Sequence, residues 1–172
     1  MPVYFPISYL KEEERKRIIE EAVRIGYSIG KQYIKAPELV DRPAKPADFG
    51  LSGNSFTWSG TTDSNGVLTI VDETLDDDEV IVIYGLASKS TSPTINAITF
   101  ETGSEKIADF FFEDMYVQDV PEIIFDKPIV YSPKSRMVIK ITSTSTSASI
   151  SEELILKAVV IEKAGKNISK PK

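Results

Sequence analysis

The sequence predicts a mainly β fold: an antiparallel β-sandwich, jelly-roll-like with about eight strands, preceded by an N-terminal amphipathic helix. Three observations predict it. Short runs of β-branched and aromatic residues recur along residues 51–165, with turn residues between them. An apolar stripe with helical spacing comes first, within residues 1–36. Isoleucine is far commoner than leucine, which suits strands.

The first 36 residues are expected to form a helical arm, because their apolar residues recur at spacings of three and four. Such a stripe must be covered, either by the chain's own β domain or by a helix of another subunit. Gly26 and Gly30 form a small-xxx-small pair, which would let a second backbone approach closely. The candidate interface residues are therefore Ile18, Ala22, Ile25, Gly26, Ile29, Gly30 and Tyr33.

Residues 37–50 contain three prolines among charged residues and cannot continue the helix, so a semi-stiff connector is expected there. The β-sandwich domain is expected over residues 51–165, and a basic tail over residues 166–172. The organisation is thus an arm, a linker, a body and a tail.

The body divides into strands at its turn signals. Phe56 and Trp58 alternate with polar residues, and an Asn65-Gly66 step follows them as a hairpin-turn signal. The Ser/Thr-rich run at residues 142–151 has no apolar face and predicts a long hairpin tip or a polar edge. The remaining predicted strands cover residues 67–71, 80–87, 94–101, 106–113, 123–125, 128–132, 136–142 and 154–162.

Composition excludes many kinds of chemistry. The 172 residues include no cysteine and no histidine, which excludes thiol and imidazole nucleophiles, disulfides, and thiolate or imidazole metal sites. There are 26 acidic and 20 basic side chains, so the acidic body is not expected to bind nucleic acid. No secretory signal and no membrane-spanning run is expected. We expect neither a catalytic site nor a cofactor.

Acidic residues near residues 61–79 are the candidates for calcium. Residues 61–72 place oxygen-bearing side chains at EF-hand-like spacing, but the first position lacks a carboxylate, the last is Asp, and no helical pattern flanks the loop. Solvated turns are the preferred interpretation, and no metal site is expected. The calcium candidates are Asp63, Asn65, Asp72, Asp76 and Asp78.

The sequence also offers residues for two further kinds of site, a catalytic carboxylate pair and a sugar-binding surface. A pair of carboxylates could act on a glycosidic bond, with Asp109, Glu113, Asp114 and Asp119 as the acids available, although nothing in the sequence pairs them. Aromatic side chains could stack on sugars, but their strand positions favour core packing. These aromatic residues are Trp58, Tyr84, Phe110, Phe112, Tyr116 and Tyr131.

An amphipathic arm, a Pro-rich joint and a β-sandwich body together resemble the plan of single-jelly-roll virion proteins, capsid or surface. The stretch Glu122–Ile141 also looks like the late strands of small sandwich domains. The resemblance implies a non-enzymatic structural protein, located in the virion or in the cytoplasm of the host cell. Its partners would be copies of itself and other virion proteins. The alternative is a carbohydrate- or receptor-binding module, with or without calcium. Few amide residues and no cysteine also fit a heat-adapted source, and equally an AT-rich genome.

Overall fold

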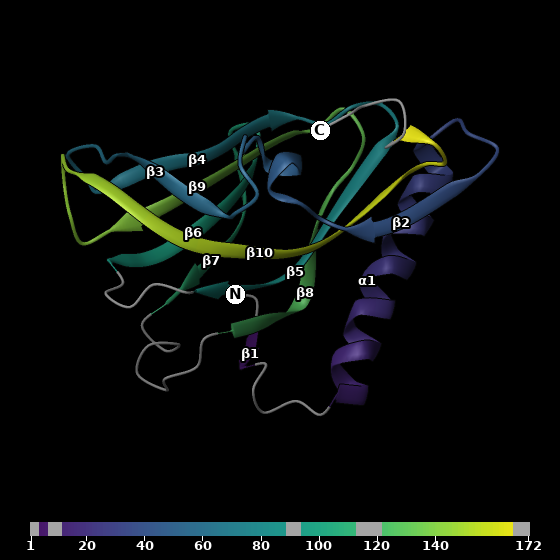
Figure 1. Cartoon of the computed structure of the whole chain (residues 1–172), viewed down its shortest axis with the longest axis horizontal. Coiled ribbons are helices and arrows are strands. Elements are labelled where there is room, and N and C mark those ends of the chain that lie inside the picture. The colour runs from purple at the N-terminus through teal and green to yellow at the C-terminus, as the bar shows by residue number, and fades with distance from the viewer. Residues whose placement is uncertain (1–3, 7–11, 89–93, 113–121, 167–172) are drawn as a thin grey trace.

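Two antiparallel β-sheets stack face to face, and one helix lies on the outside of the larger sheet (Figure 1). This computed structural model describes residues 4–6, 12–88, 94–112 and 122–166. The larger sheet contains β1 (Tyr4–Pro6), β2 (Leu39–Pro43), β3 (Thr57–Thr61), β5 (Glu79–Ser88), β8 (Glu122–Tyr131) and β10 (Ser149–Lys163). The smaller sheet contains β4 (Val67–Thr74), β6 (Ile95–Thr102), β7 (Glu105–Phe111) and β9 (Arg136–Ser143).

The strand order is that of a jelly roll. Counted along the chain from β3 to β10, the larger sheet pairs the first, eighth, third and sixth strands, as β3-β10-β5-β8. The smaller sheet pairs the second, seventh, fourth and fifth, as β4-β9-β6-β7. This alternation between two four-stranded sheets forms the two Greek keys of the fold. The predicted fold class is confirmed, and β1 and β2 are additions to it.

The main core fills the space between the sheets. Inward-facing apolar residues of both sheets meet there, as expected for a sandwich. Phe110 and Phe125 stack with ring centroids 3.9 Å apart, and Phe100 meets both rings edge-on at 6.0 Å. The indole nitrogen of buried Trp58 donates a hydrogen bond of 2.8 Å to the Leu154 carbonyl. The predicted core packing is confirmed for Trp58, Phe110, Phe112 and Tyr131, whereas Tyr84 is half-buried and packs against a second apolar cluster.

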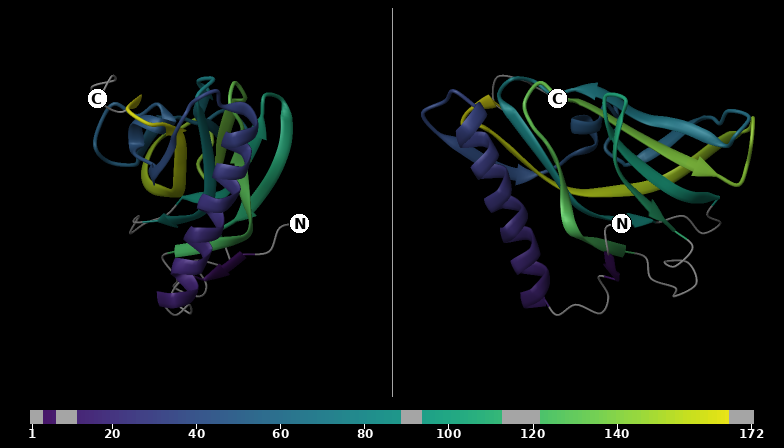
Figure 2. Two further views of the ribbon diagram at one scale, coloured as in Figure 1. Left: turned by 90° about the vertical axis from the view of Figure 1, so that its right-hand side faces the viewer. Right: turned by 180° about the vertical axis from the view of Figure 1, so that it is seen from behind.

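A second apolar layer lies between α1 (Glu12–Tyr33) and the outer face of the larger sheet (Figure 2). Val82 of β5 and Ile161 of β10 lie beneath the helix. A Cβ added to Gly26 would lie 2.4 Å from Cγ1 of Ile161, so the missing side chain lets the helix backbone approach the sheet. The apolar stripe is therefore covered by the chain's own sheet, which is one of the two alternatives that the sequence left open.

Several element boundaries differ from the prediction. Residues 37–50 contain β2 and a 3-10 helix, η2 (Pro46–Phe49), whose Phe49 is buried in the main core. The two strand segments predicted at residues 123–132 form one strand, β8. The Ser/Thr-rich run enters β10, which pairs with β3 through Ser149–Glu153. The turn at Gly66 carries the chain from β3 in one sheet to β4 in the other, instead of joining two paired strands.

Candidate functional site

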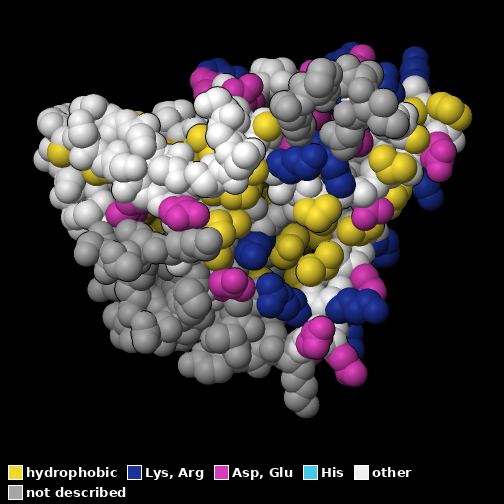
Figure 3. All heavy atoms as spheres, viewed as in Figure 1, with side chains coloured by type: hydrophobic (Ala, Val, Ile, Leu, Met, Phe, Trp, Pro, Cys, Tyr) yellow, Lys and Arg dark blue, Asp and Glu magenta, His cyan; other side chains and the backbone are white. Residues whose placement is uncertain are grey.

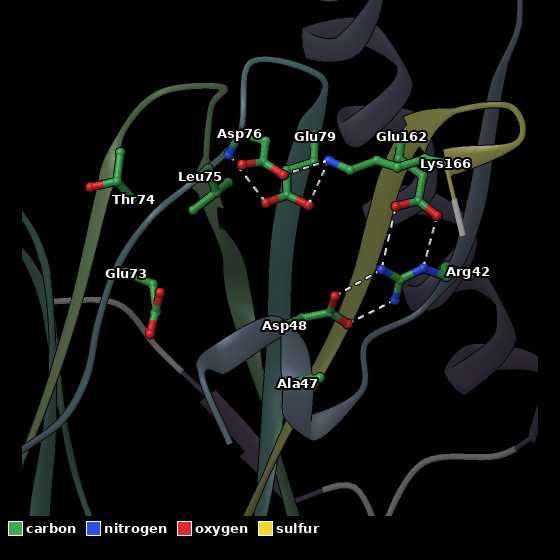
Figure 4. Close-up of a pocket in the computed structure, with 10 residues that line it drawn as sticks. All are labelled: Arg42, Ala47, Asp48, Glu73, Thr74, Leu75, Asp76, Glu79, Glu162 and Lys166. Carbon is green, nitrogen blue, oxygen red and sulfur yellow. Dashed lines mark hydrogen bonds and ion pairs between the residues drawn. The ribbon is translucent and has the colours of Figure 1, made fainter. Parts of the chain in front are cut away.

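A cleft of about 220 Å³ opens where β2, η2 and the end of β10 meet the turn before β5 (Figure 4). Arg42 of β2 is one of the residues that line it. Its guanidinium donates to both carboxylate oxygens of Asp48 at 2.7 and 2.8 Å, and through Nε to Glu162 at 3.0 Å. Glu162 is almost completely buried, with 1% exposure. One arginine thus bridges two carboxylates that come from η2 and β10.

A second cation completes the cleft. Lys166, which follows β10, is buried and lies between the carboxylates of Asp76, Asp78 and Glu79. Its Nζ is 3.1 Å from Asp76 and 3.2 Å from Glu79, and it also contacts Asp78. We refer to Arg42, Asp48, Glu162, Lys166, Asp76, Asp78 and Glu79 together as the ion-pair cluster.

The charges of the ion-pair cluster stabilise one another. Burial alone would lower the pKa of Arg42, but its hydrogen bonds to Asp48 and Glu162 raise it above the ordinary arginine value. Burial would also lower the pKa of Lys166, yet the carboxylates around it raise that pKa. In turn, burial would raise the pKa of Asp78, and Lys166 lowers it. Arg42, Lys166 and Asp78 therefore remain charged at neutral pH, and the ion pairs of the cluster fasten β2, η2 and the end of β10 together.

The calcium candidates are engaged in other contacts. Asp63 Oδ1 accepts hydrogen bonds from the backbone N–H groups of Asn65 and Val67, at 2.8 and 2.9 Å. Asp72 accepts two from the guanidinium of Arg136 at 2.8 Å, which lowers the pKa of Asp72. Asp76 and Asp78 lie against Lys166, as described above. Within the described ranges, no group of three or more acidic side chains is arranged to hold a metal ion.

The other end of β10 carries a second buried acid. Glu152 accepts hydrogen bonds from the backbone N–H and the hydroxyl of Thr94, at 2.6 and 2.9 Å, through Oε1. Its Oε2 is buried and has no hydrogen-bond partner among the residues that the structure describes. Glu152 thereby attaches the start of β6 to β10. Of the carboxylates weighed for glycoside chemistry, Asp109 bonds to Thr99 and Lys106; residues 113, 114 and 119 and Tyr116 lie outside the described residues.

Strand β7 exposes large apolar side chains at an edge of the smaller sheet. In the part of the chain that the structure describes, β7 pairs only with β6. Ala108 and Phe110 point into the core, so Ile107 and Phe111 point outward, with exposures of 43% and 50%. Exposed apolar side chains on an edge strand are typical of a surface that pairs with another chain.

The candidate interface residues of α1 occupy three different environments. Ala22, Gly26 and Gly30 are buried against the chain's own sheet, so a partner could reach them only if the helix left that sheet. The isoleucines at positions 18, 25 and 29 are half-buried. Tyr33, at the end of the helix, is 55% exposed. Of these candidates, Tyr33 and, in part, the three isoleucines are therefore accessible to a partner.

A groove of about 850 Å³ runs along one flank of the N-terminal half of α1. Ile19 and Val23 form its apolar wall, and the charged residues around them are Glu12, Arg15, Lys16, Glu20 and Asp41. Figure 3 shows apolar side chains beside the helix, with basic and acidic groups around them. At its C-terminal half the helix is fixed to β2, because the Tyr27 hydroxyl donates to Asp41 at 2.8 Å.

The ion-pair cluster and Glu152 were not predicted from the sequence. The partners are far apart along the chain: Arg42 and Glu162 are separated by 120 residues. The available signal was the charge at an inward-facing position of a β strand, since Glu152 and Glu162 share the side of β10 that carries Leu154, Leu156 and Val160.

Two comparisons with known proteins found no match, and a third found a distant structural likeness. No protein-family model matches the chain, and no curated protein matches it. The crystal structure of the infectious bursal disease virus VP2 subviral particle overlaps 75% of this chain with 10% sequence identity and a TM-score of 0.38. The overlap covers 33% of the VP2 chain, so this chain spans about a third of that protein. The likeness to this viral protein is one of architecture only. The jelly-roll assignment is based on the strand order and not on this likeness.

Proposed function

We propose that the chain is a non-enzymatic structural subunit of a virus particle, a capsid or surface component that associates with copies of itself. The contacts would be made by α1 and by the edges of the sandwich. Other proteins of the particle are further partners under this proposal. The observation that carries it is the jelly-roll strand order combined with exposed Ile107 and Phe111 on the edge strand β7.

The jelly roll narrows the choice of function. It occurs in viral capsid proteins, lectin domains and cupins. A sugar-binding role by aromatic stacking needs accessible rings, whereas Trp58, Phe110, Phe112 and Tyr131 are buried. Metal-dependent sugar binding needs free carboxylates, whereas Asp72, Asp76 and Asp78 are paired with cations. These features support the structural interpretation over the binding module.

The ion-pair cluster supports the same interpretation. The cations and carboxylates of the cluster pair with one another, and these ion pairs fix β2 and η2 to the sandwich. A rigid attachment of this kind suits a subunit that must keep one shape in an assembly. The cluster would bind a substrate only by giving up its internal pairs, which is costly for buried charges.

The proposal is tested by light scattering and electron microscopy of the purified chain. We expect oligomers or particles for the natural chain, and a large reduction in the associated fraction for Ile107→Lys and Phe111→Lys. Asn54→Lys is the matched control, because Asn54 is exposed in the loop between η2 and β3, outside the helix and the strands. A natural chain that stays monomeric would contradict the proposal. Equal association of all four proteins would remove β7 from the interface.

A further inference from the structure

The N-terminal third of α1 projects beyond the sheet that covers the rest of the helix. Residues 12–17 are all exposed, and burial begins in the next turns, with Ala22, Gly26 and Gly30. Figure 1 shows the start of the helix extending past β10 and β2. This projecting end bears the groove lined by Ile19 and Val23. Among the described residues, the sheet covers Ile19 and Val23 only in part, so this surface remains partly open.

Two charges that line the groove, Lys16 and Glu20, are self-complementary under reversal. Reflected about position 18, Lys16 exchanges place with Glu20. An antiparallel copy of the same helix in the groove would therefore meet opposite charge at both positions. A two-fold interface needs this property, because each residue faces the mirror position of an identical surface.

We propose that the groove beside α1 binds the same helix segment of a second copy of this chain, antiparallel about a two-fold axis near Ile18. This inference rests on the proposed self-association and specifies one contact that makes it. Positions 16 and 20 each lie about 3 Å along the helix axis from position 18. Lys16 of one chain would thus lie beside Glu20 of the partner subunit, and the reverse pair would form on the other side of the axis.

The contact has an apolar centre and a charged rim, as protein interfaces commonly do. Ile19 is one residue from the axis, so the two copies of Ile19 would meet near the centre, with Val23 extending the apolar wall. Lys16 and Glu20 remain accessible to a partner: their own pair is 4.0 Å apart, and their side chains are 78% and 65% exposed. The groove, the projecting helix end and the charges of Lys16 and Glu20 all favour the same helix of a second copy as the bound partner.

Charge reversal tests the arrangement directly by sedimentation equilibrium. Lys16→Glu and Glu20→Lys should each weaken self-association by about tenfold, since each puts like charges together twice in the two-fold contact. An equimolar mixture of the two variants should restore it, because every pair is then opposite. The chain with both substitutions should also associate like the natural one. Lys31→Glu, an exposed position with the same charge change on the last turn, is the matched control and should have no effect.

The outcomes separate this inference from the proposed function. A monomeric natural chain overturns both. A natural chain that associates, together with variants that associate equally well alone and in the mixture, overturns the helix contact but leaves self-association through β7 standing. Weakened variants that the mixture does not rescue would also contradict the two-fold arrangement. Circular dichroism should show the same helix content for all variants, because the substituted side chains are exposed.

Discussion

At the scale of single residues, Arg42 determines how firmly the segment after the helix is held. Its side chain is 13% exposed and bridges Asp48 and Glu162, whose side chains are 6% and 2% exposed. Removing one member of a buried pair leaves an uncompensated charge, and the cost of that charge exceeds the gain from the pair itself.

Arg42→Ala should therefore lower the free energy of unfolding by about 3 kcal/mol or more. Arg24→Ala, which removes an exposed arginine that pairs with Glu21, should cost no more than about 0.5 kcal/mol. Chemical denaturation of the two variants measures both values. Equal, small losses would show that Glu162 is stable without a cationic partner.

Gly26 is a second residue with a specific structural role. Alanine at an exposed helical position usually stabilises relative to glycine, but a Cβ at Gly26 would collide with Ile161. Gly26→Ala should thus lower the free energy of unfolding by about 1–3 kcal/mol. Ser28→Ala, at an exposed position of the same helix, should leave stability unchanged or slightly increased. Thermal unfolding distinguishes the two, and a stabilised Gly26→Ala would contradict the close helix–sheet packing.

The ion-pair cluster predicts a pH range of full stability. The pKa of Asp78 is lowered on folding, so its contribution is complete above the ordinary value of 3.8 and is lost as the pH falls through its folded pKa. The pKa of Lys166 is raised, so its contribution is complete below 10.5 and is lost as the pH rises through its folded pKa. Urea unfolding of the natural chain and of Asp78→Asn should differ by a constant amount at intermediate pH, and the difference should shrink in acid below 3.8. A difference that persists unchanged in strong acid would exclude the ionised pair as its cause.

At the scale of elements, local patterns predicted most strands and the helix, because alternation and helical spacing are visible within one segment. What covers the helix could not be predicted in the same way. Gly26 and Gly30 allow close approach to any backbone, and only the tertiary structure shows that Ile161 and Leu39 fill the space. The sequence predicts a hairpin turn at Gly66, whereas the structure has a connection between the two sheets there. The reason is similar, because a turn signal does not indicate which sheet the next strand enters.

The helix contributes to the stability of the β-sandwich, so its removal should strongly destabilise the chain. Deletion of residues 1–36 would expose Val80, Val82, Val159 and Ile161, which are all nearly fully buried. Each contributes about 1.5–3 kcal/mol when buried, which together approaches the stability of a typical domain. The truncated chain should aggregate or lose its cooperative unfolding transition. A soluble, cooperatively folded body would show instead that α1 is a detachable arm.

At the scale of the whole molecule, the structure combines a well-packed interior with apolar side chains that remain exposed at the surface. The ion-pair cluster and the aromatic core fix the sandwich internally, whereas β7 exposes Ile107 and Phe111, and the groove beside α1 has an apolar wall of Ile19 and Val23. Composition and strand pattern were sufficient for the fold class, but the surfaces depend on which residues the folded chain leaves exposed.

Self-association of the chain can be measured through its mass in solution, by sedimentation velocity of the full chain over a hundredfold range of concentration. We expect a mass that rises above the 19.1 kDa of one chain as the concentration increases, and that falls with added salt at a fixed concentration. A mass of 19.1 kDa at every concentration would contradict self-association.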